Sequence, residues 1–97
     1  MKAFFVAQIN IKNPEKFQQY AQGAGASMQP YGGELVTKGK AARQLAGVSE
    51  YGNVAIVSFP NQESLESWFE SDAYQNLISL RDEAADMLLT SYNVPSP

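Results

Sequence analysis

The sequence predicts an α+β fold in which two helices cover one face of a four-stranded antiparallel sheet. The strongest observation is the order of its hydrophobic patterns: strand, helix, strand, strand, helix, strand, which is the split βαβ (βαββαβ) arrangement. A second observation is the length of 97 residues without a repeat or a linker, which allows a single domain over residues 1–97. The third is that two of the expected strands are apolar on both sides.

The first half of the chain is expected to contain a strand, a helix and a second strand. Residues 2–11 alternate as a strand, with apolar odd positions and with even positions that turn polar at Gln8 and Asn10. Asn13 and Pro14 are typical of a helix start, because Asn caps free amides and Pro suits the first turn. The apolar stripe of that helix consists of Phe17, Tyr20, Ala21, Ala24 and Met28. Pro30 and Gly32-Gly33 end it, and residues 34–39 form the second strand.

The second half repeats the pattern in the order strand, helix, strand. Residues 51–59 form a strand, and Asn61 caps the helix that follows. Ser71-Asp72 interrupts this helix and can re-cap its continuation. The inner side of the helix and of its continuation carries Leu65, Trp68, Phe69, Tyr74, Leu77, Ile78 and Ala85. Residues 86–94 form the last strand.

Strands that are apolar on both sides predict an assembly of two copies. The helices cover only one face of the sheet, so Phe4, Val6, Val54 and Ile56 would leave an apolar patch on the other face. A lone soluble protein rarely tolerates such a patch. We therefore expect a homodimer with isologous contacts, in which two sheets pack face to face into a barrel.

The composition excludes several classes of protein. The chain has no Cys and no His, which excludes disulfide scaffolds, thiol nucleophiles, the usual zinc sites, Ser-His-Asp relays and His ligation of haem. Glu63, Glu66 and Glu70 cluster opposite the apolar side of their helix, which is typical of a solvated surface. We expect no metal and no cofactor.

The distribution of charge also limits the kinds of partner that the protein is expected to bind. The net charge is −3, with six Lys/Arg against two Asp/Glu in residues 1–49 and one against eight in residues 50–97. Six scattered basic residues make a poor track for phosphates, so no nucleic-acid partner is expected. No apolar run approaches the roughly 18 residues of a membrane span, and the N-terminal run lacks a cleavage pattern. We expect a cytoplasmic protein without a membrane partner.

Arg81 is the most informative candidate for a functional site. It lies in the middle of an apolar helical stripe, where a guanidinium must reach a carboxylate, a carbonyl, a ligand or solvent. One interpretation is a structural Arg that pairs or snorkels near a helix end. The other is a clamp for a ligand carboxylate, which suits its forked geometry.

The other candidates for ligand binding are aromatic or polar. Trp68, the only tryptophan, packs in a core or forms a cavity wall, and Tyr74 and Tyr20 lie on neighbouring apolar stripes. Gln8 and Ser58 are polar residues on otherwise apolar strand faces, where they line a pocket or mark the wet end of a barrel. General acid–base chemistry would fall to Tyr, Lys, Asp or Glu, and the sequence shows no poised pair.

Several short motifs, taken together, resemble the domain-of-unknown-function family thirteen-thirty. They are Tyr31-Gly32-Gly33, Lys38-Gly39, Phe59-Pro60, Trp68-Phe69, Ser71-Asp72-Ala73-Tyr74-Gln75 and Leu80-Arg81. The resemblance implies a bacterial protein with a ferredoxin-like fold that forms a dimeric α/β barrel. The wider superfamily includes cofactor-free monooxygenases, haem-degrading enzymes, muconolactone isomerase and stress-related dimers, but this family has no agreed activity. Asn53 and Ser58 stand where the pattern usually has Arg and Glu, and Lys38 and Lys40 replace Arg and Gly.

Three hypotheses for function follow. The first is a homodimer that binds a small metabolite near the boundary between helices and sheet, with Arg81, Trp68, Tyr74 and Gln8 as lining residues. The second is a cofactor-free monooxygenase or isomerase acting on a small aromatic compound, which Trp68, Tyr20 or Arg81 would orient. The third is a structural or regulatory dimer without a ligand.

Overall fold

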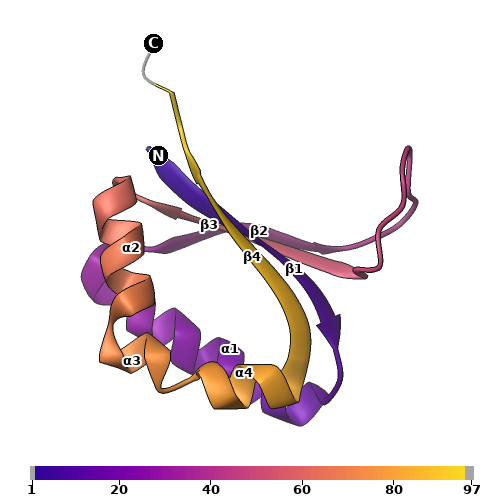
Figure 1. Cartoon of the computed structure of the whole chain (residues 1–97), viewed down its shortest axis with the longest axis horizontal. Helices are drawn as coiled ribbons and strands as arrows, with labels where there is room; N and C mark the ends of the chain where they lie inside the picture. Colours follow the sequence, from indigo (N-terminus) through magenta and orange to yellow (C-terminus); the bar gives the residue numbers. More distant parts are fainter. Residues whose placement is uncertain (1, 96–97) are drawn as a thin grey trace.

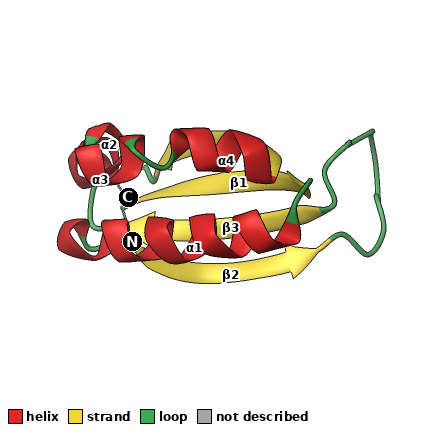
Figure 2. Ribbon diagram, turned by 90° about the horizontal axis from the view of Figure 1, so that it is seen from below, coloured by secondary structure: helices red, strands yellow, loops and turns green. Residues whose placement is uncertain are grey.

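The computed structural model describes residues 2–95 of the chain. Its strands are β1 (Ala3–Ile11), β2 (Glu34–Lys40), β3 (Asn53–Phe59) and β4 (Ala85–Asn93). They form one antiparallel sheet in the order β2-β3-β1-β4, and the helices lie together on one of its faces (Figures 1 and 2). The predicted fold class is confirmed. β3 begins two residues later than predicted, and β4 begins one residue earlier, at Ala85.

The register of the strands decides which side chains share a face. Along β1 the odd residues from Ala3 to Ile9 are buried under the helices and the even residues are half-buried. Val6 lies opposite Ile56 of β3 and Thr90 of β4, so these three residues share the other face. We call this side of the sheet, away from the helices, the open face.

Helix α1 (Pro14–Met28) forms as the sequence predicts. The Asn13 side chain accepts a hydrogen bond from the backbone N–H of Lys16 at 3.1 Å, and Pro14 occupies the first helical position. A short 3₁₀ turn, η1 (Gln29–Tyr31), follows, and Gly32 ends it with a φ of 77°, a backbone conformation that favours glycine.

The second helical region is divided into three pieces, α2 (Gln62–Glu70), α3 (Asp72–Gln75) and α4 (Ile78–Ala84). The first break is the predicted one: Ser71 is extended, and its Oγ accepts from the N–H of Tyr74 at 3.3 Å to begin α3. The second break, between Gln75 and Ile78, was not predicted and turns α4 back along α1 (Figure 2). No helix in residues 2–95 has the length and apolarity that crossing a membrane requires.

The core between helices and sheet is mainly aromatic. Its largest fully buried side chains are Trp68, Tyr74 and Phe59. The Phe5 ring from β1 stacks on Trp68 from α2, with ring centroids 5.2 Å apart and planes 6° apart. Packing α2 against the sheet therefore depends on flat ring contacts.

The open face carries the apolar surface that the sequence predicts. Phe4, Val6, Val54 and Ile56 are half-buried there. Leu88 and Tyr92 of β4 extend the surface with 45% and 46% of their area exposed, and Tyr92 stacks on Phe4 at 5.2 Å. No described segment covers this face of the sheet in Figure 1.

Residues 41–52 form a long loop that projects beyond the end of the sheet (Figures 1 and 2). Its base is held by Asn10, which donates to the carbonyl of Glu50 at 2.6 Å and accepts from the N–H of Gly52 at 3.0 Å. The apolar side chains of Leu45 and Val48 are almost fully exposed in it.

Candidate functional site

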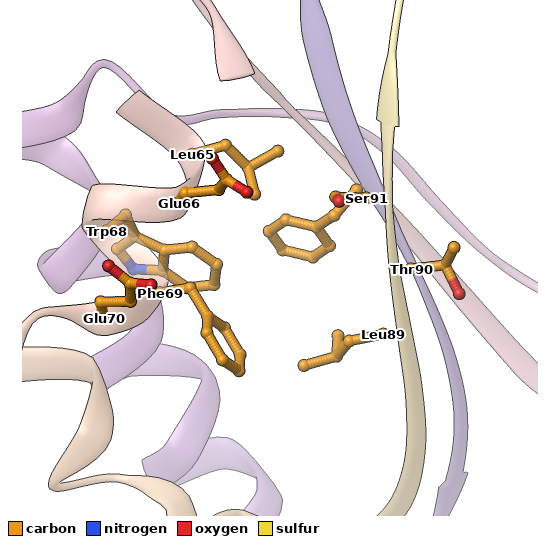
Figure 3. A pocket seen from close by; sticks show the side chains of 9 residues that line it. Leu65, Glu66, Trp68, Phe69, Glu70, Leu89, Thr90 and Ser91 are labelled. Carbon is orange, nitrogen blue, oxygen red and sulfur yellow. The ribbon is translucent and has the colours of Figure 1, made fainter. Parts of the chain in front are cut away.

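A cleft of about 250 Å³ lies between α2 and the edge strand β4. Aromatic and aliphatic side chains line most of it, and polar side chains lie along its border. The lining residues are Phe5, Leu65, Glu66, Trp68, Phe69, Glu70, Leu89, Thr90 and Ser91. Figure 3 shows the Phe69 and Leu89 side chains facing each other across the cleft, whereas the Thr90 side chain points away from it. The cleft is thus an apolar slot at the edge of the sheet.

Local structure of α2 sets the α2 wall of the cleft. The Asn61 side chain accepts from the N–H of Ser64 at 2.7 Å and starts the helix directly after β3. Leu65, Trp68 and Phe69 then fall at i, i+3 and i+4, so they lie on the side that faces the sheet. Leu65 and Trp68 are buried, but Phe69 keeps 37% of its surface exposed.

Hydrogen bonds fix the orientation of Trp68. Its indole Nε1–H donates to the hydroxyl of Ser27 on α1 at 2.8 Å, and that hydroxyl donates to the carbonyl of Ala24 at 2.7 Å. Ser27 is a buried polar residue whose hydroxyl has both its donor and its acceptor role filled. The Trp68 ring therefore forms a rigid wall of the cleft.

Three of the predicted site residues form a hydrogen-bonded cluster. Arg81 Nη1 donates to the hydroxyl of Tyr74 at 3.0 Å, and the hydroxyls of Tyr74 and Tyr20 lie 2.9 Å apart. Arg81 Nε also reaches Asp82 Oδ1 at 3.4 Å, a weak pair because the Asp82 carboxylate is largely exposed. The structure thus brings together residues of α1, α3 and α4 that lie up to 61 positions apart in the sequence.

Burial shapes the protonation of this cluster. Desolvation, followed by the neighbouring Tyr74, raises the pKa of Tyr20 far above its ordinary value, so Tyr20 stays neutral. Burial lowers the pKa of Arg81, but the hydrogen bond to Tyr74 and the Coulombic effects of Tyr74, Tyr20 and Asp82 together outweigh it and raise the pKa overall. Arg81 therefore keeps its charge, and Tyr20 supplies no general base.

The cluster lies behind the wall of the cleft and does not line it. The Tyr74 ring packs on Trp68 with centroids 4.5 Å apart and on Phe69 with centroids 5.2 Å apart. Arg81, Tyr74 and Tyr20 are not among the lining residues. Of the predicted site residues, Trp68 alone lines the cleft.

Gln8 and Ser58 lie on the open face, on the other side of the sheet. Gln8 is paired with Val54 of β3 and Leu88 of β4, and Ser58 with Phe4 of β1. The Ser58 hydroxyl reaches the carbonyl of Glu34 at 3.4 Å. The sheet separates Gln8 from the other three lining residues of the first hypothesis.

The part of the cleft that β4 supplies is not predicted from the sequence. Leu89 and Ser91 alternate on the helix side of β4, but no local pattern shows that α2 stands away from this edge strand. The sequence predicts that Glu66 and Glu70 lie on a solvated surface. Both are exposed, as expected, and both also lie at the border of the cleft.

Comparisons with known proteins place the chain in its family. The model of the family described as domain of unknown function (DUF1330) matches residues 2–92, so the chain belongs to this family. No curated protein matches the sequence. A protein of unknown function from Rhodopseudomonas palustris is 17% identical with a TM-score of 0.79, covering 98% of this chain and 83% of its own.

Two further solved structures share the fold at low identity. SnoaB, a cofactor-independent oxygenase from Streptomyces nogalater, is 9% identical with a TM-score of 0.70 and covers 99% of this chain and 95% of its own. A dimeric ferredoxin-like protein of unknown function from Thermobifida fusca is 9% identical with a TM-score of 0.60, covering 97% and 92%. At such identities the likeness shows a ferredoxin-like fold alone.

Proposed function

We propose that this protein is a homodimer that binds a small one-ring metabolite in the cleft between α2 and β4. The observation that carries the proposal is the aromatic slot formed by Phe5, Trp68 and Phe69. Ligand sites are concave and mostly apolar, with a few polar groups that orient the ligand, and this cleft has that composition. The hydrogen bond from Trp68 to Ser27 preorganises one wall, which reduces the entropy lost on binding.

The size of the cleft sets the size of the ligand. An apolar protein cavity of about 150 Å³ holds benzene, and sites for drug-sized molecules begin near about 300 Å³. A cleft of about 250 Å³ therefore fits one substituted ring better than a fused ring system. In this proposal Trp68 contacts the ligand, and Tyr74, Tyr20 and Arg81 hold the wall from behind.

The open face supports the homodimer. Its apolar side chains from β1, β3 and β4 form a surface that a second copy can cover through isologous contacts. The Thermobifida fusca protein of the same fold is dimeric, which agrees with self-association. The cleft lies on the helix side of the sheet, so covering the open face leaves it accessible. Gln8 and Ser58 would lie within or beside that interface.

A ligand screen tests the cleft directly. We expect a one-ring compound to change the fluorescence of Trp68, which is the only tryptophan, and to raise the melting temperature. At one hundred times Kd the stabilisation is about 2.7 kcal/mol, which corresponds to about 10–20 °C for a domain of this size. The Leu89→Phe variant, which fills the cleft, should lose both effects.

Leu45→Phe is the matched control, because Leu45 lies in the exposed loop far from the cleft, and it should bind like the wild type. Binding that survives Leu89→Phe would contradict this site. If no compound in a metabolite library changes either signal, the third hypothesis, a dimer without a ligand, replaces the proposal.

A second candidate function is a cofactor-free monooxygenase or isomerase acting on a small aromatic compound. The hydroxyls of Tyr20 and Tyr74 share one hydrogen bond, which uses the hydrogen of only one of them, and the Tyr74 oxygen also accepts from Arg81. The hydrogen of the other hydroxyl has no acceptor within residues 2–95. In this candidate the substrate lies outside the cleft, at the partly exposed Arg81 side of the cluster, and its developing oxyanion would provide that acceptor. Turnover of an aromatic quinol under air should fall about 100-fold or more in Arg81→Ala and stay unchanged in Arg43→Ala. Equal loss in both variants, or no turnover in the wild type, removes this candidate.

A further inference from the structure

We propose that the cleft between α2 and β4 selects a monocyclic aromatic amine, with the ring inside the slot and the ammonium group at its acidic border. The inference rests on the proposed binding function and adds the chemical class of the ligand. It follows from the shape of the walls, from the sign of the charges around them and from the hydrogen bonds that Arg81 already makes within the protein.

The walls fit a flat ring. The Phe5 ring is stacked on Trp68, and Phe69 stands edge-on to Trp68 with centroids 6.1 Å apart and planes 68° apart. Phe69 and Leu89 oppose each other across the opening (Figure 3). An inserted ring can thus contact an aromatic edge on the α2 side and an aliphatic side chain on the β4 side, arrangements that aromatic rings favour.

The charges at the border are all negative. The residues that line the cleft, within the described range 2–95, include the two carboxylates of Glu66 and Glu70 and no Lys or Arg. The two glutamates lie at i and i+4 on α2 and therefore point to the same side of the helix (Figure 3). The ion pairs found among the described residues involve Asp82, Glu83 and Asp86, not these two. Both carboxylates are therefore available to a ligand cation.

Arg81, the residue that the sequence offers as a clamp for a ligand carboxylate, already has partners within the protein. Its guanidinium donates to Tyr74, and the Trp68 and Phe69 rings that pack on Tyr74 lie between it and the cleft. A ligand carboxylate in the cleft would face Glu66 and Glu70 without a compensating cation. The two carboxylates would repel a ligand carboxylate, whereas they would attract an ammonium group, which the aromatic faces also stabilise.

A matched set of three probes tests the inference: benzylamine, benzyl alcohol and benzoate. The three share one ring and differ in charge. With Trp68 fluorescence as the readout, we expect benzylamine to bind about tenfold or more tightly than benzoate, with benzyl alcohol between them. The difference between benzylamine and benzoate should shrink as salt rises from low to high concentration, because the border carboxylates are exposed to solvent.

The double variant Glu66→Gln, Glu70→Gln separates charge from packing. It should weaken benzylamine about fivefold and leave benzyl alcohol within about twofold. Folding should be preserved, since Glu70 lies in the last turn of α2, where a negative charge is unfavourable. Glu63→Gln is the control, because Glu63 is an exposed residue of the same helix that does not line the cleft. It should leave all three affinities unchanged.

The outcomes distinguish this inference from the binding function on which it rests. Benzoate binding as well as benzylamine, or an unchanged benzylamine affinity in the double variant, overturns the amine inference and leaves the cleft as a ligand site. The same holds if the three probes fail while another compound binds in a way that Leu89→Phe abolishes. If no compound binds the cleft at all, both proposals are wrong.

Discussion

Ser27 shows how a single polar residue can organise a candidate site. It is buried between α1 and α2, and its hydroxyl links the Trp68 indole to the backbone of α1. Without that hydroxyl the indole N–H would be buried with no acceptor, which is costly in a low-dielectric interior. The wall of the cleft therefore depends on a side chain from another helix.

Replacing Ser27 with Ala should lower the free energy of unfolding by about 1–3 kcal/mol, because the Trp68 N–H loses its acceptor. Urea unfolding followed by Trp68 fluorescence measures this change. Ser67→Ala, on the exposed side of α2, should shift the free energy by less than about 0.5 kcal/mol. Equal effects in the two variants would show that the Ser27 hydroxyl does not support Trp68.

Tyr20 makes the free energy of unfolding depend on pH in the alkaline range. Its pKa is raised in the folded state by burial and by Tyr74, so the folded protein holds the phenolic proton more tightly than the unfolded chain. The resulting stabilisation is complete below the unfolded pKa of about 10 and is lost as pH rises beyond it. Tyr20→Phe should therefore reduce the fall in stability above about pH 10, as measured by urea unfolding at a series of pH values. A slope equal to that of the wild type would contradict the buried, neutral Tyr20.

Arg81 marks the limit of sequence reasoning at the residue scale. The sequence predicts that its guanidinium reaches a carboxylate, a carbonyl, a ligand or solvent. It reaches the Asp82 carboxylate at 3.4 Å, but its closer partner, the Tyr74 hydroxyl at 3.0 Å, is not among those predicted. The identity of the partner was not predictable, because Tyr74 and Arg81 lie on opposite sides of the unpredicted turn between α3 and α4. Gln8 shows the same limit: its face of β1 was predicted, whereas the separation of that face from Arg81 required the three-dimensional register.

At the scale of elements, short turns fix how the helices meet the sheet. The turn after η1 brings Gly32 against Pro60, the residue directly after β3, and holds the end of α1 near the start of α2. Strands and the cap of α1 were predicted because their signals are local: alternation, Asn13 and Pro14. The division of the second helical region was predicted only at Ser71, because the later break is set by packing of α4 on α1.

Two glycine substitutions compare the effect of an added side chain in this turn with its effect in the middle of a helix. Gly32→Ala should lower the free energy of unfolding by about 1–2 kcal/mol, because φ is +77° and an added Cβ would lie 2.8 Å from Pro60 Cγ. Gly25→Ala, in α1 with nothing within 4 Å of the added Cβ, should raise it by about 0.5–1 kcal/mol. Thermal unfolding distinguishes the two signs. A neutral Gly32→Ala would mean that this turn is not strained by a side chain.

At the scale of the whole molecule, the sheet divides two different surfaces. The helix side contains the core, the hydrogen-bonded cluster of Tyr20, Tyr74 and Arg81, and the cleft, whereas the open face presents apolar side chains from three strands. A chain of 97 residues has a thin core and therefore a small free energy of unfolding. Covering the open face would bury more apolar area and increase that free energy. In the proposed function, ligand binding uses one side of the sheet and self-association uses the other.

The self-association is tested by placing one charge on the open face. Ile56→Lys introduces a cation at the centre of the apolar surface, opposite Val6, and burying it unpaired in an interface is costly. Lys is a mild change for a half-buried strand position of a monomer, so the variant should fold as a single domain. Lys38→Ala, a substitution of an exposed residue, is the control and should assemble like the wild type.

Sedimentation equilibrium at micromolar concentration measures this self-association most directly. We expect twice the chain mass of 10.6 kDa for the wild type and for Lys38→Ala, and the single chain mass for Ile56→Lys. A wild-type protein that sediments as a stable monomer, with Val54 and Ile56 in contact with water, would contradict it.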